Sequence, residues 1–377
     1  MKRILFITVS APGNRGGGGE VYTAELLREL SSFCMIDLVY FRYKDKAIYE
    51  PCNANVRVIR ETIIDQSFKI RGFLSKLPVF PYFSARYSKK VSSFLKKQVE
   101  DGKYDAVYFD HSQTFAYVKD IIHPCKILMC HDVVAQNYMR RKSKLTCWVK
   151  ASEKALLSSG NAIFTLSEKD CDLIRDFYGI NSFHTTLYVP EIVKKTFPTE
   201  VGDYYVMFGA WGRPENCSAL QWMIDEIAPK INKQIKIKII GGGVMPADLR
   251  AKVESLPFFE YVGFVDNPYP IIANAIAEIV PLIHGAGVKV KCIEALACGT
   301  PVIGTDVAFE GIPRLAGTEE LMIKVSGVEE IVNAIQSVQV GIEKRIMAKN
   351  AFCAGYDQKN IVAYIRNDFN ERAVSAS

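Results

Sequence analysis

The chain has 377 residues, of which 49% are hydrophobic and 23% charged, and its formal net charge is +6. This composition is that of a globular protein, excludes a mainly disordered chain, and leaves room for two domains. The modest positive charge suits an acidic ligand or an anionic surface, but by itself it does not indicate nucleic acid binding.

The cysteines and the N-terminus narrow the class of protein further. Ten cysteines are scattered without a C-x-x-C pair, so we expect no zinc site, no disulfide framework and a reducing cytosol. The apolar run from Ile4 to Val9 is too short for a signal peptide and runs into a glycine-rich loop, which favours a buried strand. No stretch approaches the ~18 apolar residues that a membrane span needs.

In the first half of the chain, short apolar runs alternate with amphipathic segments. The pattern predicts a helix over residues 20–33 and strands over residues 3–10, 35–41, 56–61, 104–110, 125–132 and 161–167. This alternation is typical of a parallel sheet covered by helices. We therefore expect residues 1–190 to form a Rossmann-like α/β domain, with a C-terminal helix near 360–377 packing back on it.

A second series with the same rhythm follows residues 188–203, which hold two prolines and a lysine pair and read as the interdomain linker. The predicted strands are 204–211, 235–243, 259–265, 275–283 and 301–306, and the predicted helices are 217–231, 247–255 and 290–298. Residues 191–360 are thus expected to form a second Rossmann-like domain. Two such domains facing a central cleft would place their strand C-termini around a ligand.

Two glycine loops follow predicted strands. In "SAPGNRGGGGE", residues 10–20, the four glycines expose backbone N–H groups ahead of a helix, as an anion would require. The loop is not a P-loop, because Glu20 stands where that motif has Lys. A flexible turn is the alternative. The loop at Gly241–Gly243 fits a ligand contact and a tight turn equally well.

The stretch "HGAGVKVKCIEALACGTP", residues 284–301, is the most informative. Its glycine loop runs into a helix whose free N–H groups would face a phosphate. Lys291 and Glu294 stand three residues apart on that helix, which alone would suggest a surface ion pair. However, Glu294 precedes a small-residue run typical of a buried helix, so its carboxylate needs partners that sugar hydroxyls could supply.

Residues 285–312 resemble the retaining, nucleotide-sugar-dependent glycosyltransferases of family 4 (glycosyl transferases group 1), which have the GT-B fold. The resemblance covers "GAGVKVKCIEALACGTPVIGTDVAFEGI", with weaker echoes at the N-terminal glycine loop and at His131, 163–170, 208–216, 239–243 and 261–267. It implies transfer of a sugar from a nucleotide-diphosphate sugar to a hydroxyl acceptor, with retention. Cell-surface polysaccharide or lipopolysaccharide synthesis by a cytoplasmic, peripheral membrane enzyme is the implied setting.

The same resemblance assigns roles to particular residues. It implies that Glu294 binds the donor ribose, that Arg213 with Lys289 or Lys291 holds the diphosphate, and that His131 contacts the transferred sugar. On the donor side it further implies Gly17, Gly18, Gly212, Gly243, Gly285, Ala286, Gly287 and Glu310. Asp110 and His111 follow a predicted strand and are candidates for the acceptor side. For His131, a core histidine that caps a strand end is the alternative.

Two positions depart from the family pattern. Ala286 stands where many members carry a Glu, and Ser218 stands where many carry a second diphosphate-binding Lys. Enzymes of this type neutralise the leaving diphosphate with Lys, Arg and helix N-termini, so we expect neither a metal nor another cofactor.

Three other functions share parts of this pattern. A nicotinamide-dependent oxidoreductase is disfavoured, because the dinucleotide fingerprint is absent. A nucleotide-sugar epimerase would isomerise the donor without consuming an acceptor. A non-catalytic partner subunit would bind the nucleotide sugar without turnover, and Ala286 and Ser218 are the residues in its favour.

Residues 68–100 are strongly basic, with eight Lys and Arg residues, one acid (Glu100) and seven interleaved aromatic residues. Two amphipathic helices with a solvated basic face would explain the stretch. We also expect that it can lie on an anionic membrane surface near a lipid-linked or other glycan acceptor. Nucleic acid is not an expected partner.

Overall fold

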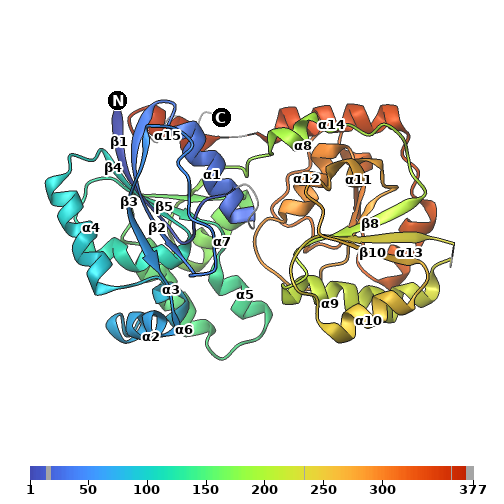
Figure 1. The fold of residues 1–377 in the computed structure, drawn as a ribbon, viewed down its shortest axis with the longest axis horizontal. Helices are drawn as coiled ribbons and strands as arrows, with labels where there is room; N and C mark the ends of the chain where they lie inside the picture. Colours follow the sequence, from blue (N-terminus) through green and yellow to red (C-terminus); the bar gives the residue numbers. More distant parts are fainter. Residues whose placement is uncertain (14–17, 233, 358, 371–377) are drawn as a thin grey trace. The chain divides into compact units, whose positions relative to one another are not determined.

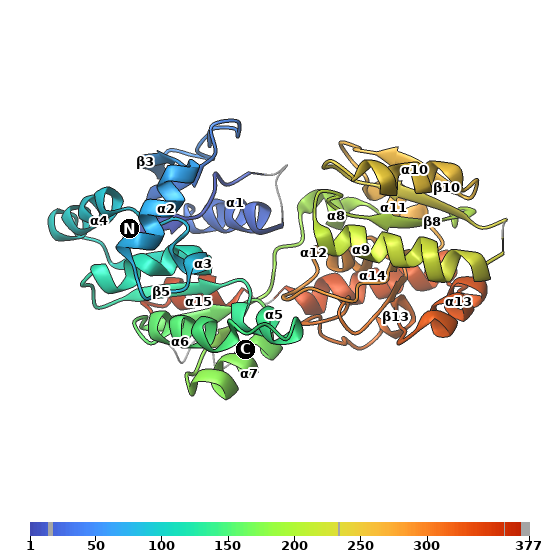
Figure 2. The same ribbon diagram turned by 90° about the horizontal axis from the view of Figure 1, so that it is seen from below.

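The structure is a computed structural model that describes residues 1–13, 18–232, 234–357 and 359–370. The chain forms two compact units (Figures 1 and 2). The first comprises Met1–Tyr188 with the C-terminal segment that follows Asp357, and the second is Val189–Asp357. The division falls two residues before the predicted boundary between 190 and 191.

The first unit is built on a parallel seven-stranded sheet in the order β3-β2-β1-β4-β5-β6-β7. Its strands are β1 (Lys2–Thr8), β2 (Cys34–Arg42), β3 (Val56–Ile63), β4 (Ala106–Asp110), β5 (Lys126–Cys130), β6 (Ala162–Thr165) and β7 (Phe183–His184). The six longer strands match the predicted ones. The two-residue β7 is too short to leave a periodic pattern.

Helices cover both faces of this sheet (Figure 1). They are α1 (Gly18–Leu30), α2 (Gln66–Ser75), α3 (Pro81–Ser84), α4 (Lys89–Asp101), the 3-10 helix η1 (Ser112–Asp120), α5 (Val134–Arg140), α6 (Thr146–Leu157), α7 (Glu168–Tyr178) and α15 (Asn360–Arg366). The short α15 packs on the sheet through Tyr364, whose ring lies 5.4 Å from that of Phe164. Residues 371–377 of the expected C-terminal helix lie outside the described residues.

The second unit holds a parallel six-stranded sheet in the order β10-β9-β8-β11-β12-β13. Its strands are β8 (Tyr204–Phe208), β9 (Lys236–Ile240), β10 (Phe259–Gly263), β11 (Glu278–Val280), β12 (Val302–Gly304) and β13 (Met322–Lys324). Its helices are α8 (Glu191–Lys195), α9 (Pro214–Trp222), α10 (Ala247–Ser255), α11 (Tyr269–Asn274), α12 (Val290–Cys298), α13 (Val328–Ser337) and α14 (Ile342–Tyr356). Together the two sheets confirm the predicted pair of Rossmann-like domains.

Some predicted boundaries differ from the structure. The segment 188–203, expected to lack regular structure, contains α8, whose Val193 and Lys194 carbonyls accept hydrogen bonds from the buried Lys349. The helix expected over 217–231 begins at Pro214 and changes after Trp222 into a π-helical turn and a 3-10 turn. By contrast, α12 has the predicted bounds, because Gly299 ends it with a positive φ of 80°.

Both sheets reverse their strand order once, and the reversal fixes where a ligand can bind. In the first unit it lies between β1 and β4, and in the second between β8 and β11. Connections leave in opposite directions at such a point, which opens a crevice at the carboxyl ends of the two strands. No helix in the described parts of the chain is long and apolar enough to cross a membrane.

Candidate active site

Asp110 is the centre of a polar cluster at the strand-order reversal of the first unit. It ends β4 and is fully buried. Its Oδ2 atom accepts hydrogen bonds from the hydroxyls of Thr8, at the end of β1, and Thr23, on α1, at 2.7 and 2.6 Å. Its Oδ1 atom lies 2.8 Å from Nε2 of His131, which directly follows β5. The carboxylate thus ties together the ends of three strands and the first helix.

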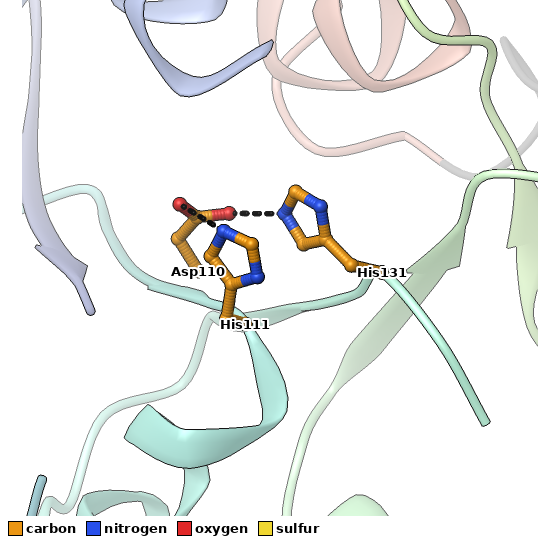
Figure 3. A group of neighbouring side chains, drawn as sticks. All are labelled: Asp110, His111 and His131. Atoms are coloured by element: carbon orange, nitrogen blue, oxygen red, sulfur yellow. Dashed lines mark hydrogen bonds and ion pairs between the residues drawn. The ribbon is translucent and has the colours of Figure 1, made fainter. Parts of the chain in front are cut away.

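His111 completes this cluster, as Figure 3 shows. Its ring stacks on that of His131 with centroids 3.4 Å apart, and its Nε2 lies 3.7 Å from Oδ2 of Asp110. The residue has a positive φ of 64°, which is strained for a side chain with a Cβ. Gly19 on α1 closes over the pair, because a Cβ there would lie 2.7 Å from the His111 ring. The two histidines are therefore held tightly.

The members of this cluster differ in their protonation states. Burial alone would raise the pKa of Asp110, but His111, His131 and the hydrogen bonds from His131 and Thr23 hold it below its usual value. Burial, assisted by neighbouring His131, lowers the pKa of His111 to about 3. Asp110 is therefore ionised and His111 neutral at physiological pH, and the carboxylate fixes the orientation of the His131 ring.

The geometry argues against a metal in this cluster, although ligand atoms of Asp110, His111 and His131 lie within 4.8 Å of one another. The imidazole planes of His111 and His131 differ by only 10°. The nitrogen lone pairs of the two stacked rings are therefore nearly parallel and do not converge on one ion. Asp170 and Asp172, whose spacing is that of an Asp-x-Asp metal-binding motif, lie on α7. Asp170 is buried against Ser167 there, whereas Asp172 pairs with Arg175 at the surface.

In the second unit, Lys291 spans the strand-order reversal. It lies in the first turn of α12, which follows β11, and its Nζ donates to the carbonyl of Phe208 at the end of β8, at 2.9 Å. It also donates to the Asn216 side chain on α9, at 2.8 Å. The ammonium is not on the surface, as a simple i, i+3 pair with Glu294 would have placed it.

Glu294 lies one turn further along α12 and is buried. One carboxylate oxygen accepts a hydrogen bond from the hydroxyl of Tyr269, at the start of α11, at 2.9 Å. Burial raises the pKa of Glu294 to about 7, against the opposing effect of that hydrogen bond. The carboxyl has further acceptor capacity, as a ribose contact would need.

A third ionisable residue, Glu278, lies beside Lys291 and Glu294 and was not identified from the sequence. Glu278, the first residue of β11, is fully buried, and both its carboxylate oxygens lack a hydrogen-bond partner among the described residues. Burial raises its pKa to about 8, opposed by Lys291 and reinforced by Glu294. In the sequence it stands within an apolar run, where only its charge marks it.

The glycine loops bring backbones together. A Cβ at Gly241, where φ is 126°, would lie 1.9 Å from the Gly209 carbonyl, and one at Gly243 would lie 2.7 Å from the Gly212 nitrogen. In the loop before α12, Gly285 and Gly287 have φ values of 136° and 69°. These glycines allow the loops after β8, β9 and β11 to turn tightly at one edge of the sheet.

The other predicted donor residues of this unit surround that edge. Arg213 caps the start of α9 with an exposed side chain, and Lys289 caps the start of α12. The Lys289 ammonium donates to the carbonyls of Ala286 and Gly287. Glu310 is half-buried in the turn after β12. In the first unit, Gly18 begins α1, while Gly17 lies outside the described residues.

Ser218, which stands where many members of the resembled family carry a Lys, lies on α9. Its hydroxyl donates to the Pro214 carbonyl within α9. It lines a hollow of about 420 Å³ between α9 and α10 that also holds Asp225, Glu226 and Asp248. Three carboxylates make this hollow unsuitable for a diphosphate.

Residues 203–339 match the family described as "Glycosyl transferases group 1". No curated protein matched the chain. Among solved structures, sucrose-phosphate synthase from Thermosynechococcus elongatus is 17% identical, with full coverage of both chains and a TM-score of 0.75. S. aureus TarM, in complex with fondaparinux, alpha-GlcNAc-glycerol and UDP, is 11% identical at a TM-score of 0.69, with 98% of this chain and 100% of that chain covered.

Anabaena HepE, in complex with UDP and glucose, is 14% identical, with full coverage of both chains and a TM-score of 0.63. These structural similarities establish the GT-B fold. The family match falls on the unit that carries Glu294, Lys291 and Arg213. Together, the fold and the family match support a glycosyltransferase.

Proposed function

We propose that the protein transfers a sugar from a nucleotide-diphosphate sugar to a hydroxyl acceptor, with retention and without a metal. The observation that carries this proposal is the pair of the half-buried Lys291 and the buried Glu294 on α12, beside the strand-order reversal. The position is where parallel α/β sheets bind ligands, and the pair offers one cation and one carboxylate to a nucleotide.

Different residues of the second unit contact the ribose and the diphosphate of the donor. Glu294 accepts hydrogen bonds from the ribose hydroxyls. Arg213 and Lys289, at the N-termini of α9 and α12, neutralise the diphosphate together with the helix amides. Lys291 already donates hydrogen bonds to the Phe208 carbonyl and the Asn216 side chain. It therefore positions the loop between β8 and α9, and its positive charge adds to the electrostatic attraction for the diphosphate.

In the first unit, His131 contacts the transferred sugar and Asp110 holds the ring in place. The bond between the anomeric carbon and the diphosphate oxygen breaks, and the acceptor oxygen bonds to the same face of that carbon. The acceptor proton passes to the departing phosphate oxygen. No side chain needs to act as nucleophile in this scheme, and the cations of the second unit stabilise the leaving group.

The proposed acceptor is a glycan or lipid-linked glycan of cell-surface synthesis, reached from the cytoplasm at an anionic membrane. The basic stretch 68–100 supports the membrane part, because it carries eight Lys and Arg residues and one acid. The solved TarM structure, which contains UDP and alpha-GlcNAc-glycerol, supports a glycosidic product in a protein of this fold.

The test is a transfer assay with labelled UDP-, GDP- and ADP-sugars and a lipid extract as acceptor. We expect stoichiometric nucleoside diphosphate and glycosylated product, with the donor's anomeric configuration by NMR. Glu294→Gln serves as the inactive control. An inverted anomer would refute retention, and an isomerised free donor would identify an epimerase. Donor binding without turnover on any acceptor would identify a non-catalytic partner.

A further inference from the structure

Two stretches of the first unit contain no acidic residue at all. Residues 66–99 and 133–152 hold no Asp or Glu but thirteen basic residues: Lys69, Arg71, Lys76, Arg86, Lys89, Lys90, Lys96, Lys97, Arg140, Arg141, Lys142, Lys144 and Lys150. The first stretch forms α2, α3 and α4, and the second forms α5 and most of α6. The second stretch was not recognised from the sequence.

Within the first stretch, α2 shows its apolar side to solvent. Ile70, Leu74 and Leu77 are 60%, 62% and 56% exposed. They follow one another at i, i+4 and i+7, which places them along one stripe of the helix and its extension. The opposite side buries Phe68 and Gly72 against the core. A helix that packs on a core by one side has no structural need for three exposed aliphatic side chains on another.

The end of α5 and the start of α6 lie beside the segment that follows α2. The indole N–H of Trp148 donates to the Pro78 carbonyl, and the Phe80 ring packs against the rings of Tyr138 and Trp148 at 5.2 and 5.1 Å. Two exposed apolar side chains lie here, Met139 near the end of α5 and Leu145 just before α6. Between them stand Arg140, Arg141, Lys142 and Lys144, all exposed.

We propose that this docking face, formed by Ile70, Leu74, Leu77, Met139 and Leu145 with the adjacent cations of α2 and of residues 140–144, binds an anionic lipid bilayer. The inference deepens the membrane setting of the proposed function and does not depend on the donor chemistry. It locates the membrane contact on α2 and the loop between α5 and α6, at the lower end of the first unit in Figure 1. The helix α4, at the left of that view, lies apart from α2 and from the loop between α5 and α6.

The chemistry of the face favours a membrane over other occupants. Exposed aliphatic side chains among cations suit the boundary between headgroups and acyl chains, where both kinds are satisfied. A nucleic acid would pair with the cations but leave three leucines, an isoleucine and a methionine without a partner. Two copies of the face would bring like charges together, because neither acid-free stretch contains a carboxylate.

The experiment is vesicle co-sedimentation of the full chain with neutral phosphatidylcholine and with vesicles that contain 30–40% phosphatidylglycerol (about the fraction needed for a strong surface potential). One variant removes the apolar stripe, Ile70→Asn with Leu74→Asn. A second reverses the loop charge at Arg140, Arg141 and Lys142, each to Glu. The matched control reverses Lys90, Lys96 and Lys97 on α4, which changes the net charge equally.

We expect binding to anionic but not neutral vesicles, with a loss of at least about tenfold at 1 M salt, where the Debye length is ~3 Å. Both face variants should bind at least tenfold more weakly than the α4 control. Equal loss in the control would contradict a localised face. Full vesicle binding by the variant that lacks the apolar stripe would contradict insertion of these side chains into the membrane. A solution mass of that variant below that of the wild type would show that the stripe instead joins two copies of the chain.

Two readouts keep this result separate from the donor site and from misfolding. Each variant should retain wild-type thermal unfolding and wild-type nucleoside diphosphate binding, since the substitutions lie on exposed residues of the first unit. Vesicle binding without any nucleotide binding would uphold the docking face and refute the proposed function. Nucleotide binding and transfer to a soluble acceptor without vesicle binding at low salt would refute the docking face and the proposed membrane setting, and would uphold the proposed sugar transfer.

Discussion

Nε2 of His131 and Oδ1 of Asp110 lie 2.8 Å apart, in a hydrogen bond that joins the carboxyl ends of two neighbouring strands. Because Thr8 and Thr23 occupy the other carboxylate oxygen, the carboxylate cannot turn away from the ring. The orientation of His131 is therefore determined before any substrate arrives.

Asp110→Asn should lower turnover by about a hundredfold, the scale of a catalytic group displaced by about 1 Å, while donor affinity stays close to wild type. Steady-state kinetics and nucleotide titration separate the two effects. Thr8→Val, which removes one hydrogen bond to the same carboxylate, should give a smaller loss. Equal turnover in Asp110→Asn and wild type would remove this pair from the catalytic account.

Donor affinity should depend on the ionisation of Glu294. Burial raises its pKa to about 7, and the ionised carboxylate is the stronger acceptor for ribose hydroxyls. If the donor binds that form, the dissociation constant of a nucleotide sugar should fall about tenfold between pH 6 and pH 8. Glu294→Gln should bind about a hundredfold more weakly or worse, without this pH dependence. A variant that keeps the wild-type profile would place the ribose elsewhere.

Glu278→Gln should stabilise the protein more at pH 9 than at pH 6 and should change its stability least near pH 4. Burial raises the pKa of Glu278 to about 8, so the carboxyl is neutral below that pH and resembles the amide. A raised carboxyl pKa means that stability is lost as the pH rises from the unfolded-state value through about 8. Thermal unfolding at these pH values is the measurement, with exposed Glu260→Gln on β10 as control. Equal destabilisation at pH 6 and 9 would show a contact of another kind.

Arg213→Ala should reduce nucleoside diphosphate affinity without lowering the unfolding temperature, because its side chain is exposed. Lys291→Met should reduce both, because it leaves the Phe208 carbonyl and the Asn216 side chain without the donor that joins them. Isothermal titration and thermal unfolding distinguish the two variants, and Arg250→Ala on α10 is the matched surface control. Unchanged nucleotide binding in both variants would exclude them from the diphosphate site.

Chelation should leave turnover unchanged. The stacked rings of His111 and His131 do not converge on an ion. In the proposed mechanism, Lys and Arg side chains neutralise the charge of the leaving group. Dialysis against EDTA followed by the transfer assay is the measurement. Loss of activity that added Mg²⁺ or Mn²⁺ restores would contradict a metal-independent reaction.

The periodic patterns predicted the six longer strands of the first sheet and the bounds of α12, because local propensity and burial agree there. The small-residue run after the glycine loop likewise predicted a buried helix, and Glu294 is buried on α12. What the pattern could not supply were contacts made across the fold. Tyr269 donates to Glu294, and Thr8 and Thr23 donate to Asp110, in each case from another helix or strand. In the sequence, Glu278 is a single acidic residue in an apolar run, and its charged neighbours are known only from the structure.

The helix α5 illustrates the same limit. Asp132 precedes it in the sequence and would be its expected cap. The structure instead supplies Glu153 of α6, whose carboxylate accepts hydrogen bonds from the backbone N–H groups of Val134 and Ala135. Eighteen or more residues separate donor and acceptor, so local spacing does not predict the contact.

The most direct test of the account is thermal unfolding of wild type and Glu294→Gln with UDP-, GDP- and ADP-sugars. At about 100 times its dissociation constant, a bound donor adds roughly 2.7 kcal/mol to the free energy of unfolding. The account predicts that at least one donor raises the unfolding temperature of the wild type by several degrees and that of Glu294→Gln much less. No shift with any donor, or the same shift in both proteins, would contradict it.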